Sequence, residues 1–125
     1  MEWNDQLATG HNTIDEQHRE LIQCLNELEM ATREQRTLLA VYCITRLKHN
    51  VRNHFAFEEA VMRECGFPEL QEHIRQHQEF SASLLDFQVK SIQQDVSIEM
   101  VEFLTEQIRL HILDTDVEYV PYLTG

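Results

Sequence analysis

Residues that interrupt regular secondary structure are scarce in this chain, which has only 3 glycines and 2 prolines among its 125 residues. So few turn-forming residues exclude a meander of short strands and favour long helices. At this length, residues 1–125 are expected to form one domain that buries a hydrophobic core without disulfides or partner subunits.

Cysteine is equally scarce. Cys24, Cys43 and Cys65 are odd in number and lie within helical patterns, which indicates a reducing cytoplasm rather than a disulfide framework. We interpret each as a small buried hydrophobe rather than a reactive thiol. No apolar run reaches the length of a membrane span, and residues 1–10 lack the features of a signal peptide. The chain is therefore expected to be cytoplasmic, with no membrane insertion.

Positive charge is also in short supply. Lys and Arg together number 10 against 22 Asp and Glu, which gives a formal net charge of −12. Such an acidic chain is unsuited to binding nucleic acid or an anionic membrane surface, but it is compatible with a site that takes up cations. The sequence contains no Gly-rich phosphate loop, no CxxC pair and no nucleophile elbow.

The apolar residues recur at helical spacing in four segments. Thr13 followed by Glu16 fits a capping box at the start of the first segment. Gly66 is placed to end the second helix, and Pro68 suits the first turn of the third. Four amphipathic helices with short loops predict an all-α fold, an up-and-down antiparallel four-helix bundle with an N-terminal arm. The arm is expected at residues 1–12, and the helices at about 13–30, 38–65, 68–89 and 98–116.

Histidine, by contrast, is abundant, with 7 residues. His73 and His77 are four residues apart and share the apolar stripe of the third helix, and His54 and Glu58 form a second such pair. Every predicted helix directs at least one histidine at the bundle axis. The inward set is His18, His54, His73, His77 and His111, whereas His11 and His49 are interpreted as surface residues.

Burying five histidines and a carboxylate would be costly without metal, because each ring would need its own buried partner. Bound metal ions remove this cost, since the nitrogens and oxygens become ligands. Asp116 would complete a set of seven ligands, but it does not share a helix face with His111. It lies five residues after His111, about 140° around an ideal helix. Both reach one site only if the helix distorts or ends near Leu113, or if Asp116 projects from the following turn.

The composition of this ligand set narrows the choice of metal. The absence of thiolates disfavours structural zinc, and the number of imidazoles disfavours calcium and magnesium. Seven ligands exceed the capacity of one first-row ion, which indicates two ions bridged by carboxylates. Octahedral preference favours iron over zinc, and ligand chemistry alone leaves manganese open.

The segments IDEQH, HFAFEE, HIRQH and HILDTD resemble, in order and spacing, those of the hemerythrin family, and Trp3 and Gly10 resemble its N-terminal arm. This resemblance covers nearly the whole chain. It implies two iron ions in an oxo- or hydroxo-bridged centre that binds dioxygen at one open iron position. By the same resemblance, His73, His77 and His111 would hold one iron, His18 and His54 the other, and Glu58 and Asp116 would bridge them.

The resemblance also implies the surroundings of the two irons. An apolar pocket would enclose the oxygen site, formed by Leu21, Phe55, Ile108 and Ile112. Iron-bound histidines give their other ring N–H group to an acceptor. Glu16, Glu59 and backbone carbonyls are candidate acceptors, and the sequence does not decide among them.

One pocket position departs from the family pattern. Four residues before His111 the family commonly has a tryptophan beside the oxygen site, and this chain has Gln107. We hypothesise that the pocket is therefore more open or more polar, so that water and small anions such as azide reach the ferric pair. Faster autoxidation would follow, which suits an oxygen or redox sensor better than a store.

Three classes of function compete. The resemblance implies a non-heme di-iron protein of bacterial type that binds dioxygen as a carrier, a store or the sensing input domain of a signalling protein, with a fused or associated output domain. The alternative is a di-iron enzyme, a peroxidase, an oxidase or a nitric-oxide-handling reductase. No additional acid–base pair or cofactor motif supports it, so no enzymatic activity is expected. A structural bundle with incidental histidines would be equally stable with and without metal.

Overall fold

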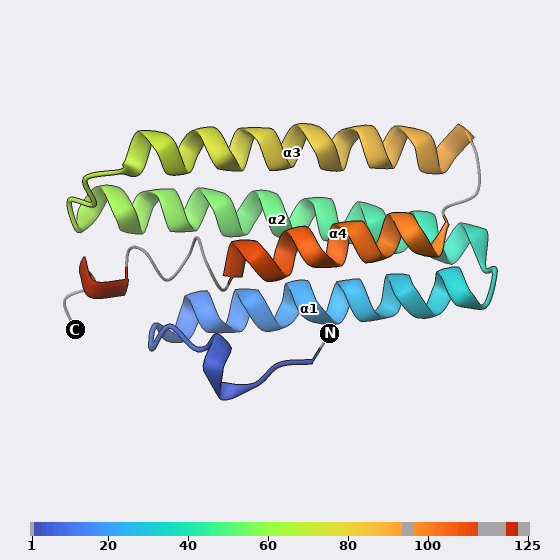
Figure 1. Ribbon diagram of the computed structural model, residues 1–125, viewed down its shortest axis with the longest axis horizontal. Coiled ribbons are helices and arrows are strands. Elements are labelled where there is room, and N and C mark those ends of the chain that lie inside the picture. The colour runs from blue at the N-terminus through green and yellow to red at the C-terminus, as the bar shows by residue number, and fades with distance from the viewer. Residues whose placement is uncertain (1, 94–96, 113–119, 123–125) are drawn as a thin grey trace.

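The computed structural model describes residues 2–93, 97–112 and 120–122. Within these residues, a short 3-10 helix precedes four α-helices that lie side by side and alternate in direction, with the N-terminal arm along the first of them (Figure 1). The prediction of an all-α, up-and-down four-helix bundle with an arm is therefore confirmed. The elements are η1 (Asp5–Leu7), α1 (Asn12–Arg33), α2 (Thr37–Glu64), α3 (Leu70–Gln93) and α4 (Ile98–Leu110). In this described part of the chain, none of the helices has the length and apolar character needed to cross a membrane.

A small hydrophobic cluster of Ile14, Met62 and Phe67 packs near the start of α1, and the main hydrophobic core extends from the middle of the bundle to the α1–α2 turn. Cys24 and Cys43 belong to this core, as predicted, and burial raises the pKa of both thiols. Cys65 is only partly buried, and its thiol donates to the Met62 carbonyl at 3.5 Å. Other members of the core are Leu25, Leu28, Ala40, Ile44, Leu47, Leu84, Phe87, Val101 and Leu104.

Two helices are longer than the sequence pattern indicated. α1 reaches Arg33 instead of ending near residue 30, and it stops only where Gln35 adopts a positive φ of 57°. α3 extends to Gln93 rather than 89. Its start is also shifted, because Pro68 lies in the turn before the helix rather than in its first turn. Gly66 has a φ of 71° directly after α2, in agreement with its predicted role as the residue that ends this helix.

The predicted capping box at the start of α1 is wrong. His11 is the N-cap, with extended backbone angles, and its Nδ1 accepts a hydrogen bond from the Ile14 N–H at 3.3 Å. Thr13 is already within the helix, so it lacks the extended backbone conformation that a capping residue needs. The interpretation of His11 as an ordinary surface residue is also wrong, because its side chain caps α1. His49 is exposed, as predicted, and pairs with Asn53.

The α-helical part of α4 ends at Leu110, whereas the sequence predicted a helix to about residue 116. Residues 113–116 of that prediction lie outside the described residues. His111 and Ile112 continue the chain in a π-helical turn. A π turn is wider than an α turn and commonly marks a functional site. The helix therefore distorts at His111, which is one of the arrangements that the spacing between His111 and Asp116 had required.

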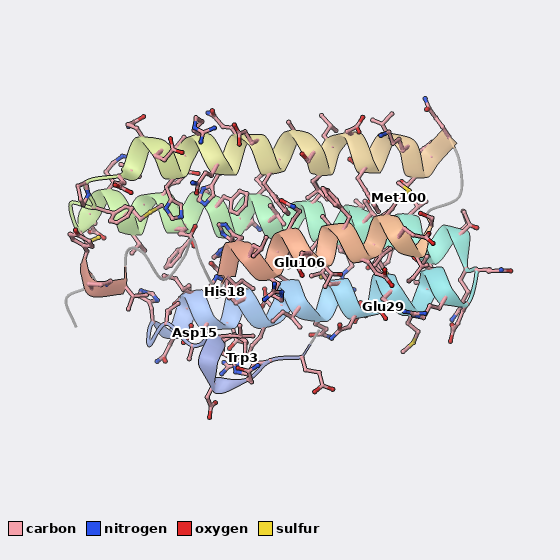
Figure 2. The ribbon with its side chains drawn as sticks, in the orientation of Figure 1. Trp3, Asp15, His18, Glu29, Met100 and Glu106 are labelled. Atoms are coloured by element: carbon pink, nitrogen blue, oxygen red, sulfur yellow. The ribbon has the colours of Figure 1, made fainter. Side chains whose placement is uncertain are left out.

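The N-terminal arm is held on α1 by Asp15, a buried carboxylate (Figure 2). It accepts hydrogen bonds from Thr9 N–H and Oγ1, both at 2.8 Å, and from Gly10 N–H at 3.2 Å. The Arg19 guanidinium lies 4.5 Å from the centre of the Trp3 ring, a cation–π contact. The arm thus closes the side of α1 that faces away from the bundle axis.

Replacing Asp15 by Asn should loosen this arm, because the amide keeps only one acceptor oxygen. If that oxygen continues to accept from Thr9, an NH2 group faces the Gly10 N–H, which then has no acceptor. Leaving a buried N–H group without an acceptor costs about 1–3 kcal/mol of unfolding free energy. Urea unfolding of Asp15→Asn measures the loss, with Glu16→Gln on the exposed neighbouring residue as the control. Equal stability of the two variants would contradict this role for Asp15.

Candidate metal centre

The five inward histidines and Glu58 meet in the other half of the bundle, near the N-terminus of α1. His18 comes from α1, His54 and Glu58 from α2, His73 and His77 from α3, and His111 from the π turn after α4. The side chains of the first five are at most 3% exposed, and that of His111 is 11% exposed. All six residues lie on the stripes that the sequence assigned to the bundle axis.

Glu58 divides the histidines into two groups. Its Oε2 lies 3.2 Å from His54 Nε2, which in turn lies 3.2 Å from His18 Nε2. Its Oε1 faces three rings, with the Nε2 of His77 at 2.8 Å, of His111 at 3.6 Å and of His73 at 3.7 Å. Two groups of ligand atoms with the spacing of a metal site share Glu58, one with His18 and His54, and one with His73 and His77.

The hydrogen bonds behind the rings fix which nitrogen of two histidines carries a proton. His77 Nδ1 lies 2.8 Å from Glu59 Oε2, and His54 Nδ1 lies 2.8 Å from Gln17 Oε1. Both oxygens only accept, so each Nδ1 is the donor. A neutral ring then directs the lone pair of its Nε2 at a Glu58 oxygen. Lone pairs that converge in this way are accommodated by an imidazolium proton or by a shared metal ion.

Metal fits this geometry well. Ligand atoms about 2.0–2.2 Å from one ion and at right angles to each other lie about 3 Å apart. The contacts of Glu58 with His77 and His54, at 2.8 and 3.2 Å, have this spacing. A donor set of imidazoles and a carboxylate, without thiolates, suits iron.

The charge of Glu58 is stabilised although the residue is buried. Burial by itself would raise the pKa of this carboxyl group. The nearby His54 charge, together with contacts from His111, His54 and His77, outweighs burial and holds the pKa well below its ordinary value. The site therefore keeps an anion at its centre, as a centre for cations requires.

Aromatic packing orients the rings of this centre. Phe55 stacks on His77 with ring centres 3.8 Å apart and planes at 2°, and its centre lies 5.0 Å from that of His111. Phe80 packs edge-on against Phe55 at 5.7 Å. The other apolar positions predicted for the ligand pocket are also buried, namely Leu21, Ile108 and Ile112.

Gln107 occupies a different environment from the rest of the predicted pocket. It is partly exposed and lines a surface groove of about 380 Å³ between α3 and α4. Phe80 lines the same groove and also contacts Phe55, so these two aromatic rings lie between the groove and the histidines.

The acceptors behind the histidines were only partly predicted. Glu59 is confirmed as the acceptor for His77, but Glu16 is exposed and its carboxylate faces Arg19 at 3.9 Å. Gln17, which was missed, bonds His54. The missed signal was its spacing, because Gln17 continues the buried stripe of α1 at intervals of three and four residues. That stripe includes Ile14, Leu21, Cys24 and Leu28. Asp116, the seventh predicted ligand, lies outside the described residues.

Comparison with known proteins identifies the chain. Residues 9–123 match the family described as "Hemerythrin HHE cation binding domain". The chain belongs to the hemerythrin family. A bacteriohemerythrin of Stenotrophomonas maltophilia is 31% identical over 118 residues, which cover 94% of this chain and 77% of that protein. A bacteriohemerythrin of Clostridium acetobutylicum is 31% identical over 125 residues, covering 94% and 97% of the two chains.

More distant relatives agree. Myohemerythrin of Riftia pachyptila is 26% identical over 117 residues, covering 94% of this chain and 88% of that protein. The crystal structure of a wild-type hemerythrin superposes with a TM-score of 0.93 at 23% identity, over 100% of this chain and 98% of the other, and shows that the fold is shared. Hemerythrins bind dioxygen at a di-iron centre and are not enzymes. This protein is accordingly a non-heme di-iron, oxygen-binding protein, and the enzyme alternative finds no support among its relatives.

Loading with metal should stabilise the fold, because the ligands converge only in the folded chain. At a free Fe²⁺ concentration about 100 times the dissociation constant, the unfolding free energy should rise by about 2.7 kcal/mol. Anaerobic urea unfolding with and without a chelator measures this gain. Glu58→Gln should lose most of it, and the surface control His49→Ala should retain it. Equal stability of the apo and loaded chains would support a merely structural bundle.

Proposed function

We propose that seven side chains hold the two irons of this protein. His73, His77 and His111 bind one iron, His18 and His54 bind the other, and Glu58 and Asp116 bridge them. The observation that carries this assignment is the division of the histidines by Glu58, with three rings near Oε1 and two on the side of Oε2. The half with two histidines has fewer protein ligands and is the half open to dioxygen.

When bound, the two irons supply the electrons and the open coordination position that dioxygen binding needs. The protein supplies orientation and a dry enclosure. Phe55 fixes the plane of His77 by stacking, and Glu59 and Gln17 fix the tautomers of His77 and His54. Leu21, Ile108 and Ile112 are at most 2% exposed and keep bulk water from the site. Water exclusion favours reversible binding, because it limits proton delivery to reduced oxygen.

The physiological role that we assign is oxygen or redox sensing rather than storage. Gln107 places a polar, partly exposed side chain in the α3–α4 groove, where the family commonly has a tryptophan. On this side only the rings of Phe80 and Phe55 separate the groove from the histidines, so the α3–α4 groove is the route by which we expect water and small anions such as azide to reach the ferric pair through an otherwise dry enclosure. A ferrous pair that oxidises readily reports exposure to oxygen, and a fused or associated output domain would transmit that state.

We assign the protein to the bacterial cytoplasm. Its cysteines, Cys24, Cys43 and Cys65, are all free thiols, and a reducing compartment keeps thiols in that form.

The decisive experiment is iron analysis combined with an absorption spectrum of anaerobically reduced protein, before and after air is admitted. The expected result is two irons per chain and a new visible absorption band that disappears when oxygen is removed. Asp116→Ala should lower the iron content or abolish the band, because it removes a bridge. The absence of iron, or an unchanged spectrum in air, would refute the proposed function.

The sensing role makes a separate prediction about autoxidation. Gln107→Trp fills the groove beside Phe80 with an apolar ring, so the oxygenated protein should decay to the ferric form several-fold more slowly. Stopped-flow and manual spectra of the decay give the rate. Glu106→Trp adds the same ring at the exposed neighbouring position and should leave the rate unchanged. If Gln107→Trp decays as fast as the parent, the groove does not control autoxidation.

A further inference from the structure

Two histidines of the centre make hydrogen bonds of equal length to acceptors that differ in charge. His77 donates its Nδ1–H to the Glu59 carboxylate, and His54 donates its Nδ1–H to the Gln17 amide oxygen, both at 2.8 Å. Each histidine is in contact with a different oxygen of Glu58. The charged acceptor therefore serves the group of three histidines, and the neutral acceptor serves the group of two.

The two acceptors reach the centre from different sides of α2. Glu59, 25% exposed, lines a cleft of about 390 Å³ between α2 and α3, together with Phe55 and Leu84. Gln17 lines a polar cleft of about 500 Å³ between α1 and α2, together with Asn50 and Asn53. Glu59 bonds His77 and Gln17 bonds His54, so each acceptor is placed to act on one half of the centre.

The orientation of the rings makes the contact with Glu59 effective. Phe55 lies parallel to His77 at 3.8 Å, so the ring is held with Nδ1 toward Glu59 and Nε2 toward Glu58. A carboxylate that accepts the Nδ1 proton raises the basicity of Nε2, and a more basic ligand stabilises the ferric ion relative to the ferrous ion. A neutral amide does this much less, because charge-assisted hydrogen bonds are the stronger ones.

We propose that Glu59 and Gln17 are positioning residues that set the two irons to different reduction potentials. Glu59 lowers the potential of the iron on the side of His77, and Gln17 leaves the iron on the side of His54 easier to keep ferrous. This inference rests on the proposed function, since it assigns one iron to each half. Its consequence is that the oxygen-binding half retains its electron until dioxygen arrives.

The test is a reductive titration of the full chain loaded with two irons, in which a chemical reductant gives one electron to each iron. Glu59→Gln keeps an acceptor oxygen and removes only the charge. At a fixed potential its ratio of ferrous to ferric iron should rise at least about threefold, which is about 28 mV for a one-electron couple. Gln17→Glu adds a charge on the other side and should lower the ratio. Unchanged ratios in both variants would overturn the proposal.

Two further variants separate charge from position. Glu16→Gln removes the same charge from the cleft that Gln17 lines, but Glu16 is exposed and paired with Arg19. It should leave the potential unchanged, and a shift as large as that of Glu59→Gln would show a general charge effect and overturn the proposal. The exchange Glu59→Gln with Gln17→Glu preserves net charge, and Mössbauer spectra of the half-reduced protein should show the ferrous ion moved to the other half.

Failure of this inference can be told apart from failure of the proposed function. Two irons per chain and a reversible visible band in the parent keep the proposed function, and unchanged potentials in the variants then overturn only the roles of Glu59 and Gln17. Absence of iron in the parent refutes the proposed function itself. If Glu59→Gln loses its fold by circular dichroism, Gln17→Glu still decides, because an unshifted potential there overturns the proposal.

Discussion

The structure depends on the burial of one carboxylate, Glu58, among five imidazole rings. An ionised group at the centre of a helical bundle is costly unless charges of opposite sign surround it. Here the rings come from every helix, so the compensating groups can meet only if all helices dock in register. The low pKa of Glu58 expresses this arrangement, since His54 and the other rings outweigh the effect of burial.

Other features of the fold serve this polar centre. Toward the α1–α2 turn the interior of the bundle is almost entirely apolar, and burial of these side chains stabilises the fold that holds the polar centre. The arm adds a layer on the outer side of α1, where Asp15 bonds Thr9 and Gly10. Behind the rings, Glu59 and Gln17 determine which nitrogen of His77 and His54 faces the centre. The core and the arm therefore hold the helices in place, and the hydrogen bonds behind the rings determine the protonation of single nitrogens.

Much of the centre could be predicted from helical spacing. The pairs His73–His77 and His54–Glu58 lie four residues apart, and such residues share a helix face whatever the rest of the fold does. Local capping was harder. The sequence favoured Thr13, whereas the cap is His11, because the chain enters α1 in an extended conformation that the contacts of Thr9 and Gly10 with Asp15 hold. The role of Gln17 as an acceptor was not predicted, because a polar residue within an apolar stripe gives no signal along the sequence that its side chain bonds a histidine of another helix.

The sequence by itself determined the four helical segments, their inward faces and the residue types that meet at the centre, because these follow from periodicity and side-chain chemistry within one helix. Only the tertiary structure decided how Glu58 divides the histidines, which acceptor lies behind each ring, and that Gln107 lines the α3–α4 groove. These relations depend on the distances and rotations between helices, which no spacing along the chain encodes. The π turn at His111 belongs to the same class, since the apolar periodicity of α4 does not reveal it.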